Sequence, residues 1–261
     1  MPDPTSRDDP PAGLERRQRR RGIYLLPNLF TTATLFAGFY GILAAMDGRF
    51  GTAALAVFAA MLADGIDGRL ARLTNTQTDF GAEYDSLADL IAFGLAPALI
   101  MYLWALQPLG KPGWLAAFVY AAATALRLAR FNTQVGVADK RYFQGLPSPS
   151  AAAIMAGSVW TATDLGFPGH GLSWPMAAIT LLSGLLMVSN VRYSSFKEVD
   201  FRGKVPFIVL VAIILALAIL LLHPPSVLLS IFFIYALSGP LTTWRAMRRL
   251  RQDGGETGPE G

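Results

Sequence analysis

Long apolar runs follow one another along the chain, and each ends at a cluster of basic or turn-forming residues. Because a helix needs about 20 mostly apolar residues to cross a bilayer, these runs are candidate membrane spans. We expect eight spans: 23–46, 51–73, 80–106, 113–131, 149–165, 172–188, 205–222 and 226–244. Backbone polar groups must be paired in lipid, so each span is predicted to be helical. The pattern predicts an all-α fold, a polytopic bundle of about eight transmembrane helices.

The composition supports a membrane protein. Of the 261 residues, 53% are hydrophobic and 15% are charged, with a mean hydropathy of +0.41. A soluble domain usually carries about 25% charged residues, so this chain has too few to cover a water-facing surface. The absence of cysteine excludes a disulfide-built module and any thiol chemistry.

The basic side chains predict an orientation. A net charge of +4 would also suit a nucleic-acid-binding protein, but the lysines and arginines lie between apolar runs, so we expect no nucleic-acid partner. With the N-terminus inside, all of the 22 Lys and Arg except Arg49 and Lys111 fall on the inner side. Both termini are therefore predicted to be cytoplasmic.

Three segments are expected along the chain. Residues 1–22 form a disordered or basic N-terminal segment, in which 13–22 are a candidate interfacial helix. Residues 23–248 form one transmembrane domain. Residues 249–261 form a tail that is predicted to be disordered.

Four aspartates occur where charge is costly. Asp64 and Asp67 lie near the end of the second span, and Asp85 and Asp89 near the start of the third. Residues three or four apart share a helix face, so each pair points one way. A short connection joins the two spans, which predicts that all four carboxylates converge near the inner surface.

Clustered carboxylates in a bundle of low dielectric constant repel one another, and a divalent cation relieves that repulsion. All-oxygen ligands favour Mg²⁺, Mn²⁺ or Ca²⁺, and two metal ions are common in phosphoryl chemistry. The alternative for any single carboxylate is a structural ion pair, for example with Arg72 or Arg127.

The segment from Asp64 to Asp89 resembles the signature of the CDP-alcohol phosphotransferase family, D-x2-D-G-x2-A-R-x8-G-x3-D-x3-D. The matching fixed positions are Asp64, Asp67, Gly68, Ala71, Arg72, Gly81, Asp85 and Asp89. In this family an alcohol attacks the phosphorus next to the lipid of a CDP-linked substrate, and CMP is released.

The resemblance implies a role for each matching position. Asp64, Asp67 and Asp85 would bind metal, and Asp89 would complete the metal site and act as the general base. The CDP group would be framed by Gly68, Ala71, Arg72 and Gly81. Asn28 and Thr31, in another family-like segment, are candidates for contact with cytosine or ribose.

Two downstream stretches, 126–132 and 145–152, resemble the phosphatidylserine synthase branch of the family. Arg127, Arg130 and Asn132 are therefore candidate serine-binding residues, although positive-inside topology alone would also supply such arginines. An amino-acid acceptor brings a carboxylate that one or both arginines can neutralise.

We therefore expect a phosphatidyltransferase that uses CDP-diacylglycerol and L-serine with Mg²⁺ or Mn²⁺, while Ca²⁺ remains a further candidate ion. The resemblance also implies a homodimer among membrane lipids, in a prokaryotic inner or plasma membrane. Glycerol 3-phosphate, an inositol compound or choline are alternative acceptors. An alternative from another class is a secondary transporter whose aspartates carry cations or protons.

Overall fold

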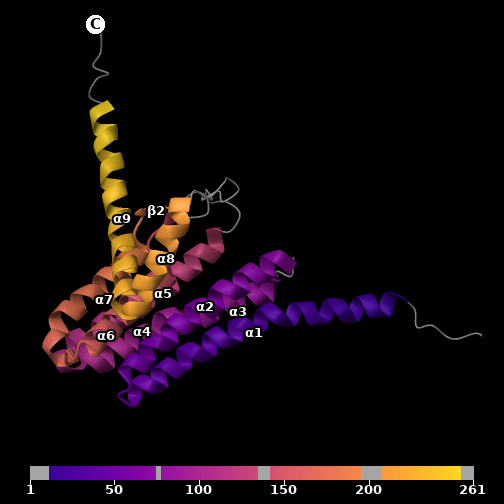
Figure 1. Ribbon diagram of the computed structural model, residues 1–261, viewed down its shortest axis with the longest axis horizontal. Helices are drawn as coiled ribbons and strands as arrows, with labels where there is room; N and C mark the ends of the chain where they lie inside the picture. Colours follow the sequence, from indigo (N-terminus) through magenta and orange to yellow (C-terminus); the bar gives the residue numbers. More distant parts are fainter. Residues whose placement is uncertain (1–11, 75–77, 135–141, 195–206, 254–261) are drawn as a thin grey trace, which may run out of the picture.

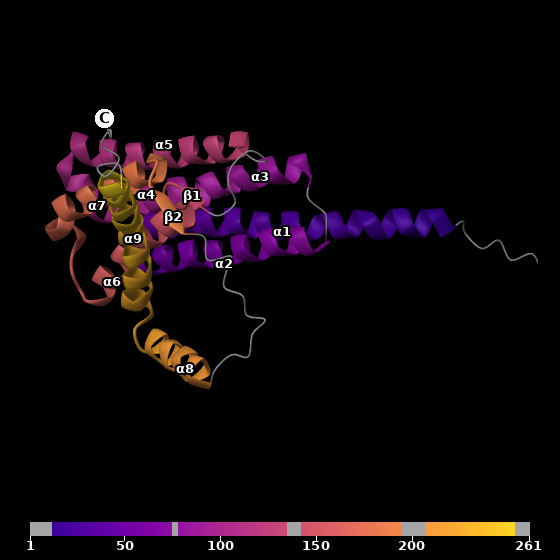
Figure 2. The same cartoon turned by 90° about the horizontal axis from the view of Figure 1, so that it is seen from above.

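A computed structural model describes residues 12–74, 78–134, 142–194 and 207–253. In it, α1, α2, α3 and α5 lie side by side, and α9 crosses them steeply (Figures 1 and 2). The elements are α1 (Ala12–Met46), α2 (Phe50–Thr74), α3 (Asp79–Asp89), η1 (Leu90–Leu95), α4 (Ala96–Met101), η2 (Tyr102–Leu106), η3 (Gln107–Leu109), α5 (Lys111–Gln134), β1 (Tyr142–Gln144), α6 (Ser148–Asp164), η4 (Gly169–Leu172), α7 (Ser173–Val188), β2 (Arg192–Ser194), α8 (Phe207–Leu222) and α9 (Pro224–Asp253).

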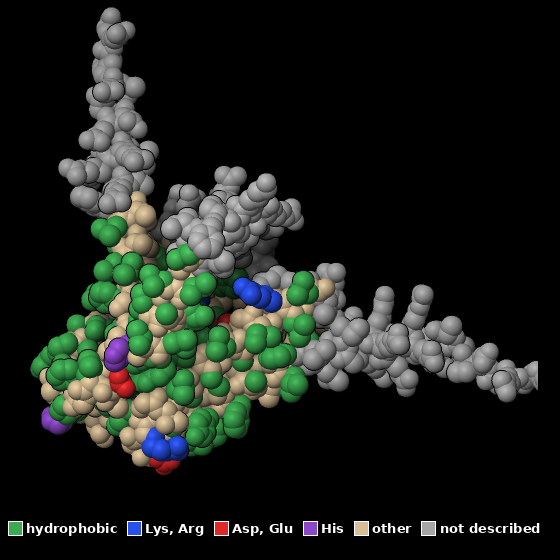
Figure 3. Space-filling view, viewed as in Figure 1, with side chains coloured by type: hydrophobic (Ala, Val, Ile, Leu, Met, Phe, Trp, Pro, Cys, Tyr) green, Lys and Arg blue, Asp and Glu red, His purple; other side chains and the backbone are tan. Residues whose placement is uncertain are grey.

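The helices confirm an all-α, polytopic membrane protein. Six helical stretches in the described residues are long and apolar enough to cross a membrane: Pro27–Met46, Phe50–Leu70, Asp79–Leu109, Lys111–Thr133, Gly169–Val188 and Pro224–Thr243. The face of the molecule drawn in Figure 3 is largely hydrophobic over its described part, with few charged side chains.

Two of the eight predicted spans, 149–165 and 205–222, are not among these six stretches of the described residues. The predicted span 149–165 is α6, with 17 residues, and 205–222 overlaps α8, with 16 residues. At 17 residues, α6 is at the lower limit of length for a membrane span, and α8 starts directly after residues 195–206, which the structure does not describe. Most of α6 is buried within the protein, from Ser150 to Val159 without a break. Its apolar composition therefore reflects packing against other helices as much as contact with lipid.

The first and last helices of the chain extend beyond the predicted spans. Helix α1 begins at Ala12 and continues without a break to Met46, and Figure 2 shows its first part extending beyond the bundle. Helix α9 passes the predicted boundary at residue 248 and ends at Asp253. Residues 1–11 and 254–261 lie outside the described part, so disorder at the two ends of the chain stays a prediction. The interfacial position of residues 13–22 also stays a prediction.

The third predicted span is not a uniform α-helix. After Asp89 the backbone forms a π-helical turn, η1, and then returns to the α-form in α4. Pro97 has no N–H and cannot donate to Phe93 O four residues earlier. The buried Tyr120 hydroxyl on α5 instead donates to Phe93 O at 3.0 Å. The carboxylate-bearing α3 therefore ends where the helix changes form.

A small antiparallel ladder, not predicted from the sequence, joins the α5–α6 and α7–α8 connections. Strands β1 and β2 pair Phe143 with Tyr193 at their centre. Tyr193 is fully buried and donates from its hydroxyl to Ala236 O on α9 at 3.0 Å. Burial, with a further contribution from Tyr235, raises the pKa of Tyr193 to about 12. The hydroxyl is therefore protonated at neutral pH and can donate this hydrogen bond. The ladder is thereby attached to α9.

Candidate functional site

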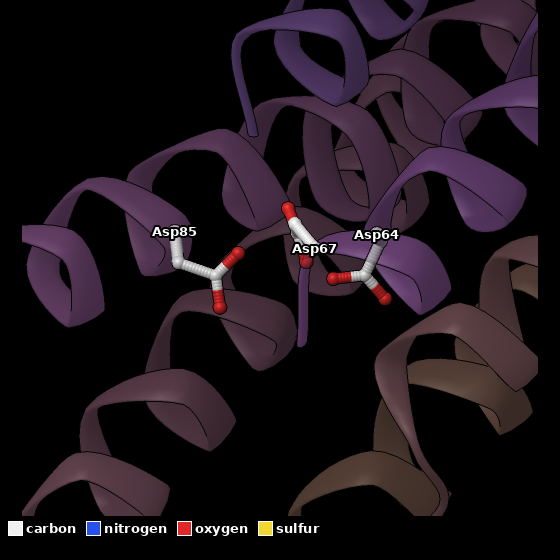
Figure 4. Close-up of side chains that lie close together, drawn as sticks. All are labelled: Asp64, Asp67 and Asp85. Atoms are coloured by element: carbon white, nitrogen blue, oxygen red, sulfur yellow. The ribbon is translucent and has the colours of Figure 1, made fainter. Parts of the chain in front are cut away.

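The four aspartates lie on two neighbouring helices. Asp64 and Asp67 belong to the last part of α2, and Asp85 and Asp89 to α3. One carboxylate oxygen each from Asp64, Asp67 and Asp85 lies within 4.8 Å of the others. Figure 4 shows these three side chains reaching toward a common space. The predicted convergence is therefore seen in the structure for these three.

Asp89 lies beside this group. Its carboxyl group is a hydrogen-bonding neighbour of Asp64, and it also interacts electrostatically with Asp67, Asp85 and Arg127. Its Oδ1 atom is buried and has no hydrogen-bond partner. A buried oxygen without a partner is costly, so this atom is suited to accept a proton or to bind a ligand.

The residues present fit a divalent cation. Four carboxylates supply the oxygen ligands that hard ions prefer. Within the described part of the chain, none of the four forms an ion pair within 4.0 Å, and Arg127 does not approach Asp89 that closely. The structural ion pair with Arg127 is therefore not formed, and the Arg72 side chain lies outside the described residues. A bound cation would offset the mutual repulsion of the carboxylates.

Asp67 is held by two further groups. Thr31 Oγ1 on α1 donates to Asp67 Oδ2 at 3.0 Å and also lies 3.2 Å from Pro27 O. The backbone N–H of Gly68 donates to the same carboxylate. Asp67 is 4% exposed, so these donors replace water around it. Thr31, predicted to contact the nucleotide, contacts a candidate metal ligand in the structure.

Two other predicted nucleotide contacts, Asn28 and Gly81, lie at the start of α3. The Thr78 side chain accepts a 3.0 Å hydrogen bond from Gly81 N and caps the helix. A Cβ at Gly81 would lie 3.5 Å from Asn28 Oδ1, so Asn28 and Gly81 are neighbours. The side chains of Ala71 and Arg72 lie outside what the structure describes.

The two predicted arginines differ in their surroundings. Arg127 Nη1 donates to Ser148 Oγ at 2.9 Å, and the guanidinium interacts with Asp89, while its Nε is buried without a partner. Arg130 instead donates to Gln144 in the ladder and to Asn190 after α7. Only Arg127 is directed toward the carboxylates.

Asn132 links α5 to the carboxylate-bearing helix. Its Nδ2 atom donates to Ser86 Oγ at 3.0 Å, and Ser86 follows Asp85 on α3. Sequence reasoning gave no role to Ser86, to Ser148 or to Tyr235, which interacts with Arg127. Ser148 lies in a stretch that resembles the family, but Tyr235 carries no recognisable sequence signal.

Comparison with known proteins identifies the family. A model of the CDP-alcohol phosphatidyltransferase family matches residues 24–185, more than half of the chain. The chain belongs to this family, which confirms the predicted class of enzyme. The match runs from α1 into α7 and includes all four aspartates, whereas α8 and α9 lie beyond it.

Several similar proteins are named CDP-diacylglycerol–serine O-phosphatidyltransferase. The one from Helicobacter pylori is 39% identical over 216 residues, which cover 82% of this chain and 90% of that protein. The one from Mycobacterium tuberculosis is 30% identical over 246 residues, 92% of this chain and 85% of that protein. The one from Methanocaldococcus jannaschii is 32% identical over 183 residues, 70% of this chain and 80% of that protein.

Proposed function

We propose that the protein transfers the phosphatidyl group from CDP-diacylglycerol to the hydroxyl of L-serine, forming phosphatidylserine and CMP. The observation that carries the proposal is the group of Asp64, Asp67 and Asp85, with their carboxylate oxygens within 4.8 Å, beside Asp89 and its neighbour Arg127. The shared name of the similar proteins supports serine as the acceptor.

The carboxylates have separate tasks in this reaction. Asp64, Asp67 and Asp85, joined by Asp89, would hold Mg²⁺ or Mn²⁺ in a site for two ions, with Ca²⁺ as a further candidate. A bound divalent ion would offset charge on the phosphate oxygens and on the leaving group. Asp89 takes the proton of the serine hydroxyl on its buried, unpartnered Oδ1.

The transfer exchanges one bond for another. The serine oxygen forms a bond to the phosphorus next to the lipid, and the bond from that phosphorus to the oxygen of CMP breaks. The serine proton goes to Asp89, and CMP leaves with the electron pair of the broken bond. Gly68, Ala71, Arg72 and Gly81, with Asn28 and Thr31, are proposed to frame the CDP group.

Arg127 is proposed to bind the carboxylate of serine. Its guanidinium is already anchored on Ser148 and lies near the proposed base, so a carboxylate placed there brings the serine hydroxyl close to Asp89. Asn132, bonded to Ser86 next to Asp85, is proposed to line the same end of the site, and Arg130 is proposed to support that end through Gln144 and Asn190. The alternative acceptors are glycerol 3-phosphate, inositol compounds and choline. Choline carries no carboxylate that Arg127 could bind.

The proposed setting is a prokaryotic inner or plasma membrane, with both termini and the site on the cytoplasmic side. All of the 22 Lys and Arg except Arg49 and Lys111 fall on one side of the predicted topology, which supports this orientation. The homodimer implied by the family resemblance is likewise a proposal. Its test is the mass of the purified protein in detergent.

One experiment tests the proposal directly. Purified protein is incubated with CDP-diacylglycerol, labelled serine and Mg²⁺ or Mn²⁺, and the lipid product is identified. We expect labelled phosphatidylserine and an equal amount of CMP, with activity lost in a chelator and restored by the metal. Preferential use of glycerol 3-phosphate, inositol or choline in competition would overturn the serine assignment. Ion flux in vesicles without lipid turnover would favour the transporter instead.

A further inference from the structure

Helix α9 lies outside the family-matched segment, yet it packs on a helix that contacts Arg127. Residues 224–253 follow the end of the match at residue 185. Helix α9 packs along α6, whose first residue, Ser148, accepts the hydrogen bond from Arg127. A helix beyond the matched region therefore packs against the helix whose first residue contacts Arg127.

The ladder is fixed to α9 by one buried side chain. Tyr193 of β2 donates to Ala236 O, and a Cβ at Gly239 would overlap the Tyr193 ring. Only glycine at position 239 leaves room for this ring. The ring of Tyr193 also contacts that of Tyr235, with centroids 5.5 Å apart and an interplanar angle of 44°. Tyr235 is thus held from one side by the ladder.

Tyr235 lies close enough to Arg127 for the two polar groups to influence each other. The two groups interact electrostatically, and Arg127 also interacts with Asp89. A guanidinium has five N–H donors, and a single hydrogen bond to Ser148 does not fix its plane. A second neighbour that is itself immobilised restricts the orientation of the group before a ligand binds.

We propose that Tyr235 is a positioning residue for the acceptor: held by Tyr193, it orients Arg127 so that the guanidinium meets the serine carboxylate. This inference rests on the proposed function. It assigns to α9 a part in acceptor affinity, while the carboxylates of α2 and α3 handle the metal and the CDP-lipid.

The test compares Tyr235→Phe with Tyr40→Phe. The first removes the hydroxyl near Arg127, and the second removes a hydroxyl that bonds Arg49 beyond the far end of α1. A polar contact to a charged group is worth roughly a factor of ten or more in affinity. We expect Tyr235→Phe to raise the serine KM about tenfold, with the KM for CDP-diacylglycerol unchanged, and Tyr40→Phe to match the wild type.

A double-mutant cycle with Arg127→Lys separates positioning from general stabilisation. If Tyr235 acts through Arg127, Tyr235→Phe adds little to the loss of kcat/KM for serine in the Arg127→Lys background. Additive losses, an unchanged serine KM, or an equal rise in both KM values would overturn the inference. Tyr193→Phe removes the hydrogen bond between the ladder and Ala236 and should also raise the serine KM. This variant tests the inference if Tyr235→Phe does not fold. A wild-type protein that makes no phosphatidylserine contradicts the proposed function itself.

Discussion

The Thr31 hydroxyl donates a 3.0 Å hydrogen bond to Asp67 Oδ2 and so joins α1 to a candidate metal ligand on α2. Asp67 is nearly inaccessible to solvent, and its orientation depends on such donors. A hydrogen bond to a ligating carboxylate fixes its direction toward the ion. The first span of the chain therefore contacts and orients a residue of the candidate metal site.

Thr31→Val should weaken metal binding. Valine keeps the shape and removes the hydroxyl, and loss of a group that orients a ligand costs about 10- to 100-fold in metal affinity. The measurement is the Mg²⁺ or Mn²⁺ concentration that gives half-maximal activity. Thr31→Ser keeps the hydroxyl and should remain close to the wild type. Equal behaviour of the valine and serine variants would contradict the orienting role.

Asp89→Asn should abolish CMP release in a protein that still binds CDP-diacylglycerol. The amide cannot take the serine proton, and general-base catalysis contributes about 10²- to 10⁴-fold. Single-turnover release of CMP measures the effect. Asp79→Asn, at the opposite end of α3, is the matched control and should turn over normally. Near-normal turnover by Asp89→Asn would refute its role as the base.

Arg127→Ala and Arg130→Ala should have different effects. Removing the Arg127 guanidinium should raise the serine KM by about tenfold or more, because a charge-assisted hydrogen bond to the acceptor is lost. Arg130 contacts Gln144 and Asn190, so its alanine variant should mainly lower the melting temperature. Serine kinetics and thermal unfolding on the same preparations distinguish the two. An equal rise in serine KM would show that both arginines bind the acceptor.

Gly145→Ala should destabilise the ladder end of the bundle. Gly145 has a φ of +78°, and a Cβ there would overlap Met187 O. The backbone conformation alone costs about 1–2 kcal/mol for alanine, and the overlap adds to it. Gly48→Ala is the control, because Gly48 has a φ of +74° and no atom within 4 Å of the added Cβ. A melting temperature of Gly145→Ala no lower than that of Gly48→Ala would contradict the steric role of Met187.

Some features of the fold could not be predicted from the sequence, for identifiable physical reasons. Helix α6 has the sequence pattern of a lipid-facing span because a buried helix and a lipid-facing helix are both apolar, and only the structure shows its burial. The π-helical turn after Asp89 precedes Pro97, and within it Phe93 O accepts a hydrogen bond from Tyr120 of another helix, which no local pattern predicts. The ladder of β1 and β2 pairs segments about 50 residues apart, which no local pattern predicts.

The sequence by itself determined the membrane class, the helical fold and the convergence of the aspartates. These follow from properties read along one dimension: apolar runs require helices in lipid, and spacings of three and four place carboxylates on one helix face. Only the tertiary structure decided that Arg127 lies near Asp89 and Tyr235, that Arg130 contacts the ladder and that Thr31 contacts Asp67. Those relationships depend on how helices rotate and cross, which packing between distant segments sets.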